Sequence, residues 1–340
     1  MSDSEPTPAP KEMPASGARA GIHCLTIPTP FAVGSVNCYL IEDDPLTLVD
    51  TGPNWGTALD ALERGLGKLG HRLEDLELIV LTHQHVDHIG LLEIIVERSG
   101  AQVAAFGPLA PWLARYPRSA AADDAWFGEI MVRHGVPGDL AVVLGVVGAA
   151  YRPYGAAAVV TRELNDGDRL ELRDRTFEVR HRPGHSPSDL VFWDAQRRIL
   201  LAGDHLLAKI SSNPLIARAL AGAPDRGRVP SLMRYIASLR ATAELGAELV
   251  LSGHGKPILD HAALIEERLR LHDRRARRIV RLLADGPLSA HDLALQMWGN
   301  AALTQAFLTL SEVLGHLDLL VDDGRVAEQD DGSLSIFKAL

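Results

Sequence analysis

The chain has 340 residues, which is long enough for a domain of about 200 to 250 residues with a smaller unit beside it. Its content of 46% hydrophobic and 23% charged residues is typical of soluble globular proteins and excludes a fibrous or largely disordered chain. A net charge of −10 disfavours polyanionic partners, and two cysteines are too few for a disulfide scaffold.

The first 20 residues are rich in proline and small residues and predict a disordered tail. They lack the apolar stretch of a secretory signal, and no run of about 18 apolar residues follows anywhere. We therefore expect a cytoplasmic protein without a membrane span. Cys24 and Cys38 could form a disulfide on neighbouring strands, but we expect two buried, reduced thiols.

Strands and helices alternate in the segment that follows the tail. Short β-branched and apolar runs predict strands at 22–27, 37–42, 46–50, 76–81 and 102–106. Apolar residues at helical spacing predict helices at 57–70 and 89–98. This order predicts a layered α/β fold.

Residues 107–158 interrupt this alternation with an alanine-rich, helix-compatible insertion that contains scattered aromatic residues. It either covers the functional site or adds helices to the core. Afterwards, strands are predicted at 168–172, 176–182, 189–193, 199–201 and 248–251. An irregular stretch from 205 to 230 and a helix to 245 separate the last two of these strands.

A long helix at 260–284 leads to a Gly286-Pro287 boundary. Beyond it, Ser289 can cap a helix to 297, a second helix fits 303–320, and 324–327 with 333–337 fit a two-stranded wing, an order that resembles a winged helix. The predicted organisation is a tail at 1–20, a catalytic domain at 21–260, a connecting helix at 261–284 and a winged-helix-like domain at 285–340.

The segment from Thr82 to His88 reads Thr-His-Gln-His-Val-Asp-His and directly follows a buried strand. From the composition, this pattern of ligands should arise by chance on the order of 0.002 times in such a chain, so a polar loop of solvated histidines explains it poorly. Imidazole and carboxylate groups are preferred ligands of Zn²⁺ and similar metals. His83 and His85 can share one metal ion, and Asp87 and His88 can serve a second.

Three further candidate ligands follow predicted strands. They are His185 in Pro-Gly-His-Ser-Pro, Asp204 in Ala-Gly-Asp-His and His254 in Ser-Gly-His-Gly. Together with the first motif they predict a site for two divalent metal ions, with Zn²⁺ first and Fe or Mn also suited to nitrogen and oxygen donors.

The first motif and these three further ligands, in this order, resemble the metallo-β-lactamase superfamily across residues 22–260. The resemblance implies a four-layer αββα sandwich, with His83, His85 and His185 on one metal, and Asp87, His88 and His254 on the other. It implies that Asp204 bridges both metals. It also points to a glyoxalase II-like or β-lactamase-like subgroup that carries a C-terminal winged helix.

The resemblance implies a hydrolase in which a metal-bridged hydroxide attacks a small ester, thioester or lactone, with Asp87 as the catalytic proton acceptor. A carboxylate at Asp204 is unlike true β-lactamases, which carry Cys or Ser there. The residues after Asp204 lack the tyrosine of homoserine lactonases, which argues against that substrate. Pro187-Ser188-Asp189 also differs from the Thr-Pro-Gly often found beside the His185 equivalent, so we expect a different local turn there.

The alternative is a phosphodiesterase or endoribonuclease that uses the same metals. Arg270, Arg274, Arg277 and Arg281 form a helical stripe that could follow a nucleic-acid backbone, although such stripes are more often solvated and paired with acids. Residues 285–340 contain nine acidic residues against Arg325 and Lys338, a net charge of −7, whereas a phosphate-binding module should be basic. Nucleic acid is therefore a disfavoured partner, and the C-terminal unit is expected to pack or to form a homodimer.

Five other residues are candidates for supporting roles. Asp50, at the end of a strand, either orients a metal-binding imidazole or caps a turn. His205 either lines the substrate pocket or is a hydrogen-bonded structural histidine. Lys209, Ser212 and Asn213, in the irregular stretch, are candidates for binding a polar part of the substrate.

Overall fold

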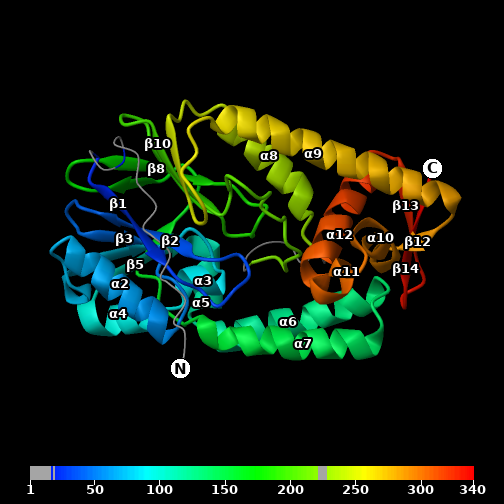
Figure 1. The fold of residues 1–340 in the computed structure, drawn as a ribbon, viewed down its shortest axis with the longest axis horizontal. Coiled ribbons are helices and arrows are strands. Elements are labelled where there is room, and N and C mark those ends of the chain that lie inside the picture. The colour runs from blue at the N-terminus through cyan, green and yellow to red at the C-terminus, as the bar shows by residue number, and fades with distance from the viewer. Residues whose placement is uncertain (1–16, 18–19, 221–227) are drawn as a thin grey trace, which may run out of the picture.

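A computed structural model describes residue 17 and residues 20–220 and 228–340 of the chain (Figure 1). The predicted disordered tail lies almost wholly outside the described residues, and so does part of the predicted irregular stretch, at 221–227. Among the helices that are described, none is both long enough and apolar enough to cross a membrane.

The first sheet has six strands in chain order. They are β1 (Ile22–Ile27), β2 (Val36–Ile41), β3 (Thr47–Val49), β4 (Leu78–Val80), β5 (Gln102–Phe106) and β6 (Arg162–Leu164). β1, β2 and β3 are antiparallel, and β3 to β6 run parallel. The short strand β6 was not predicted, because three residues carry too little pattern.

The two cysteines lie on adjacent strands of this sheet. Cys24 is opposite Tyr39 and Cys38 is opposite Leu25, so the two thiols face opposite sides, and no disulfide joins them. Cys38 is buried as expected, whereas Cys24 is only partly buried.

The second sheet has five strands in the order β11-β10-β9-β8-β7. They are β7 (Arg169–Glu171), β8 (Thr176–His181), β9 (Leu190–Asp194), β10 (Ile199–Gly203) and β11 (Leu249–Ser252). The pairs β7–β8, β8–β9 and β9–β10 are antiparallel, whereas β10 and β11 run parallel. These strands agree with the predicted ranges to within two residues at each end.

The two sheets pack face to face, with helices outside. On β4, Leu78 and Val80 point into the core between the sheets, and Ile79 points to the opposite side. That opposite side packs against α2 (Gly56–Lys68) and α4 (Leu92–Ser99). The outer face of the second sheet packs against α8 (Ser231–Ala243) and α9 (His261–Leu282), which gives the predicted αββα sandwich (Figure 1).

The insertion forms three helices, α5 (Ala110–Leu113), α6 (Tyr116–Arg133) and α7 (Gly138–Tyr151). Met131 and Val136, at the end of α6 and just beyond it, share one core with the C-terminal helices. Trp126 and Phe127 pack against the same core, and the ring centroids of Phe127 and Phe307 are 4.4 Å apart. This part of the insertion therefore belongs to a hydrophobic core.

The C-terminal elements are three helices and a small sheet. They are α10 (Ala290–Trp298), α11 (Ala301–Thr304), α12 (Ala306–Asp322), β12 (Leu288–Ser289), β13 (Val326–Asp330) and β14 (Ser335–Ala339). Ser289 caps α10 as predicted, because its hydroxyl accepts a hydrogen bond from the Asp292 N–H at 3.1 Å. α9 crosses from the sandwich to these elements (Figure 1).

Candidate metal centre

Loops that follow four strands converge on one edge of the sandwich. The loop after β4 carries His83 and His85 and leads into the short helix α3 (Val86–Ile89), which contains Asp87 and His88. The three other candidate ligands follow β8, β10 and β11, respectively, and are His185, Asp204 and His254. The structure brings all seven predicted side chains together, and all are buried except His85, which is half-buried.

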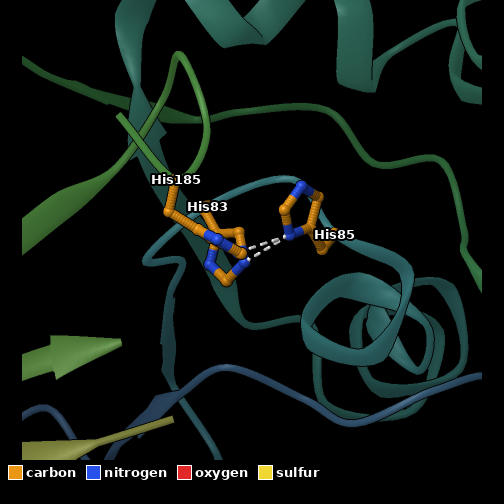
Figure 2. A group of neighbouring side chains, drawn as sticks. All are labelled: His83, His85 and His185. Carbon is orange, nitrogen blue, oxygen red and sulfur yellow. Dashed lines mark hydrogen bonds between the residues drawn. The ribbon is translucent and has the colours of Figure 1, made fainter. Parts of the chain in front are cut away.

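Three of these imidazoles meet at one point (Figure 2). His85 Nδ1 lies 2.9 Å from His83 Nε2 and 2.9 Å from His185 Nε2. A neutral imidazole carries only one N–H group. Three ring nitrogens that face one another therefore cannot all be satisfied by hydrogen bonds among themselves. This group provides three nitrogen ligands for one cation.

A second group adjoins the first and contains Asp87, His88 and His254. His254 Nε2 lies 3.2 Å from Asp87 Oδ2, and His88 Nε2 lies 4.0 Å from Asp87 Oδ1. Asp204 lies between the two groups, because its carboxylate oxygens are 3.7 Å from His185 Nε2, 3.6 Å from His88 Nε2 and 3.4 Å from His254 Nε2. The two groups contain the same residues that the family resemblance implies for two metals.

In four of the histidines, the other ring nitrogen, Nδ1, lies against a hydrogen-bond acceptor. His88 Nδ1 donates to Asp50 Oδ2 at 2.7 Å, His185 Nδ1 donates to the Asn213 carbonyl at 3.0 Å, and His254 Nδ1 donates to the Ser35 carbonyl at 2.9 Å. His83 Nδ1 lies 3.0 Å from Thr82 Oγ1, whose own proton goes to Asp50. The ring proton of each neutral imidazole is thereby placed on Nδ1.

These hydrogen bonds direct the Nε2 atoms of all four rings into the site, beside two carboxylates, where each can bind a proton or a cation. Among the described residues, His88 Nε2 and Asp204 Oδ1 are buried without a hydrogen-bond partner. A buried, unpaired polar atom costs about 1–3 kcal/mol. The donor set therefore fits divalent cations, which such lone pairs and carboxylates bind.

The pKa values of the histidines differ between the two groups of candidate ligands. Burial, together with the neighbouring imidazoles, lowers the pKa of His85 to about 3 and places that of His83 well below its usual range. Burial also disfavours the charged form of His254, but Asp204 and Asp87 outweigh it and raise its pKa to about 10. The carboxylate side of the site therefore holds positive charge, either as a proton or as a cation.

Asp50 supports the site from the end of β3. It adopts a left-handed backbone conformation, with φ of 59°, which is uncommon for a residue other than glycine. Its carboxylate accepts hydrogen bonds from the Thr82 N–H at 2.8 Å, from the Thr82 hydroxyl at 2.7 Å and from His88. Of the two predicted roles, the contacts match the orientation of an imidazole.

Gly253 allows the loop after β11 to approach the centre of the site. A Cβ at this position would lie 2.2 Å from Asp204 Oδ1 and 2.8 Å from His88 Cε1. Any side chain would therefore displace a candidate ligand.

The residues predicted to bind substrate have different environments. His205 is fully buried, with Nε2 at 2.9 Å from Thr242 Oγ1. Ser212 is buried and its hydroxyl donates to the Asp204 carbonyl. The Asn213 side chain donates to the Leu308 carbonyl at 3.0 Å, and only Lys209 is exposed. Through these contacts, His205, Ser212 and Asn213 stabilise the loop that follows Asp204.

Sequence reasoning missed three groups that orient ligands. Two are the main-chain carbonyls of Ser35 and Asn213, which no residue type reveals. The third is Asp189, whose carboxylate accepts hydrogen bonds from the N–H and hydroxyl of Ser186, at 2.8 and 2.7 Å, and so stabilises the unusual turn beside His185. Burial raises the pKa of Asp189 to about 6.

Comparisons with known proteins identify the family. A model of the metallo-beta-lactamase superfamily matches residues 32–254, which include all seven candidate ligands. The chain belongs to this superfamily. A probable metallo-hydrolase of Bacillus subtilis, YqjP, is 33% identical over 318 residues, which cover 93% of this chain and 97% of that protein. The chain is accordingly a hydrolase.

Two further proteins are similar to the chain. The crystal structure of the metallo-beta-lactamase family protein TTHA1429 from Thermus thermophilus superposes with a TM-score of 0.79 at 30% identity, covering 94% of this chain and 99% of that chain. An acyl-coenzyme A thioesterase of Bos taurus, MBLAC2, is 32% identical over 134 residues, which cover 37% of this chain and 40% of that protein.

Proposed function

We propose that the chain is a two-metal hydrolase that cleaves a small ester, thioester or lactone. The observation that carries the proposal is the set of hydrogen bonds from Nδ1 of His83, His88, His185 and His254, which leaves four Nε2 atoms facing two buried carboxylates. Such a donor set is stabilised by divalent ions, and we propose Zn²⁺, with Fe or Mn as the other ions that the donors suit.

Each group of side chains would hold one ion. We assign one ion to His83, His85 and His185, and the other to Asp87, His88 and His254, with Asp204 shared between them. When bound, two such ions lower the pKa of water enough for attack near neutral pH and polarise the substrate oxygen. Asp50 keeps His88 in the tautomer that binds a cation.

Asp87 is the proposed proton acceptor. Its side chain is 12% exposed and that of Asp204 is 8% exposed, so both carboxylates are largely shielded from bulk solvent. His254 and His88 hold the pKa of Asp87 low despite its burial, which keeps it ionised and able to take a proton from attacking water.

Two observations support an acyl substrate. The aligned part of MBLAC2, a protein named as an acyl-coenzyme A thioesterase, is 32% identical to this chain. A carboxylate at Asp204, where true β-lactamases have Cys or Ser, disfavours a β-lactam. We therefore place a thioester first in the proposed substrate class.

A substrate panel tests the proposal. Metal-replete protein would be assayed with acyl thioesters, acyl lactones, p-nitrophenyl esters and bis-p-nitrophenyl phosphate. We expect turnover of at least one acyl substrate, with loss of activity on chelation and recovery on adding Zn²⁺. Turnover of the phosphodiester alone would overturn the proposal.

The phosphodiesterase alternative depends on the arginine stripe of α9, and two of its four arginines are paired with acidic residues. Arg277 pairs with Asp273 at 2.6 Å, and Arg270 pairs with Glu266 on the same helix. The double variant Arg274→Glu and Arg277→Glu should hydrolyse acyl substrates normally. A parallel loss of RNA cleavage would favour the alternative.

The proposed role of the C-terminal unit is packing. We propose a winged-helix-like arrangement for α10, α12 and the β13–β14 hairpin, supported by their order and by β12 at the edge of β14. Its core includes Met131 and Val136 of the insertion, as expected of a unit that packs on the rest of the chain. A homodimer and a cytoplasmic location stay predictions.

A further inference from the structure

A second group of potential metal ligands lies outside the hydrolytic site, between α9 and α12. His272 on α9 faces Glu312 and His316, which are one turn apart on α12. One ligand atom from each of the three residues lies within 4.8 Å of the others. Residues four apart on a helix lie on the same face, so α12 presents its carboxylate and imidazole together.

All three side chains are buried. Their exposed fractions are 1% for His272, 6% for Glu312 and 0% for His316. Glu312 Oε1 lies 3.8 Å from His272 Nδ1 and 3.5 Å from His316 Nδ1. The carboxylate therefore lies beside both imidazoles at distances too long for hydrogen bonds, and one ligand atom of each residue is near enough to the others to share a cation.

The imidazoles have unused nitrogen atoms. Among the described residues, both ring nitrogens of His272 and Nε2 of His316 are buried without a hydrogen-bond partner. His316 Nδ1 donates to the Glu312 carbonyl at 2.7 Å, which leaves the lone pair on Nε2.

One contact opposes a cation here. The Arg275 guanidinium donates to Glu312 Oε1 at 2.7 Å, and Arg275 is a quarter exposed. The Glu312 carboxylate nevertheless has a second oxygen and further lone pairs with which to bind a metal.

We propose that His272, Glu312 and His316 form a third metal site that binds a divalent ion of the zinc class and joins α9 to α12. Two imidazoles and one carboxylate are a ligand set typical of Zn²⁺, with water completing the tetrahedron. Because the group is buried between two helices, the ion stabilises the attachment of the C-terminal elements and takes no part in hydrolysis.

Metal analysis of full-length variants, reconstituted with Zn²⁺ and dialysed, tests the proposal. Glu312→Gln keeps the side-chain volume and removes the charge, and His272→Ala removes an imidazole. Each variant should bind about one equivalent of Zn²⁺ less per chain than the unchanged protein while still hydrolysing substrate. The control is His134→Ala, which removes another buried imidazole, one that packs on Phe337 of β14. This variant should lose no metal.

Cobalt substitution gives an independent measurement. In a chain whose hydrolytic site is disabled by His83→Ala and Asp204→Ala, bound Co²⁺ should retain a tetrahedral absorption spectrum that disappears when Glu312→Gln is added. Equal metal content in the unchanged protein, Glu312→Gln and His272→Ala, or no Co²⁺ spectrum in the disabled chain, would overturn the third site. Neither result would affect the proposed hydrolytic site, whose ligands are different residues.

Discussion

Asp50 and His88 form a buried hydrogen bond of 2.7 Å that joins the end of β3 to α3. The side chains are 2% and 0% exposed, respectively, so water cannot replace either partner. Since the carboxylate accepts from Nδ1, the Nε2 atom of His88 faces Asp87 and Asp204. The orientation of His88 is therefore set by a residue that is not itself in the ligand groups.

Asp50→Asn should weaken metal binding. An amide is a weaker acceptor than a carboxylate, so the preferred tautomer and orientation of His88 are lost, and we expect metal affinity to fall about 10- to 100-fold. Competition with a chromophoric chelator would measure the affinity. The control is Asp43→Asn, another buried aspartate, whose partner is Arg175 at 2.9 Å and which should leave metal affinity unchanged.

Metal affinity should rise with pH. Asp50, Asp204 and Asp87 outweigh the effect of burial and raise the pKa of His88, and the pKa of His254 is raised to about 10. The metal-free site therefore binds protons at neutral pH, and a metal ion must displace them. For each proton displaced, metal affinity should rise about tenfold per pH unit. Calorimetry in buffers of different ionisation enthalpy should detect proton release. A binding constant independent of pH from about 6 to 9 would contradict these shifts.

Gly253→Ala should abolish metal binding, because the new methyl carbon would lie 2.2 Å from Asp204 Oδ1. Metal content after reconstitution would measure the effect. The matched variant Gly67→Ala lies in α2, where an added Cβ meets no atom within 4 Å. It should keep its metals and raise the free energy of unfolding by about 0.5–1 kcal/mol, since alanine favours helix over glycine.

Asp87→Asn should reduce kcat about 10²- to 10⁴-fold, because an amide cannot accept a proton from attacking water. Metal content must be measured on the same samples, since Asp87 is also a proposed ligand. If the variant retains both metals and full turnover, Asp87 is not the proton acceptor.

Sequence patterns predicted most strands and helices of a layered α/β fold, because the strands alternate or are wholly apolar and the helices have clear apolar faces, and the family resemblance implied the sandwich. Leu78, Ile79 and Val80 illustrate this, since they fill the cores on the two faces of one sheet. The three-residue strand β6 was missed. The association of Met131 and Val136 with the C-terminal helices could not be predicted either, because it depends on how distant segments pack.

The seven candidate ligands could be predicted because each lies just beyond a strand and is a strong metal-binding residue type. The groups that orient them were harder to find. Ser35 and Asn213 act through main-chain carbonyls, and the burial of His205 against Thr242 depends on α8. His272 and His316 were assigned no role, because they are 44 positions apart in the sequence and only the packing of α9 on α12 brings them together.

The most direct test of the proposed hydrolytic site is metal content and turnover measured together in Asp204→Ala. Asp194→Ala, which removes another buried aspartate from the opposite end of the neighbouring strand β9, serves as the control. We predict that Asp204→Ala loses at least one metal equivalent and nearly all acyl hydrolysis, whereas Asp194→Ala keeps its metals. Full turnover by Asp204→Ala with an unchanged metal content would contradict a centre in which Asp204 is shared by two ions.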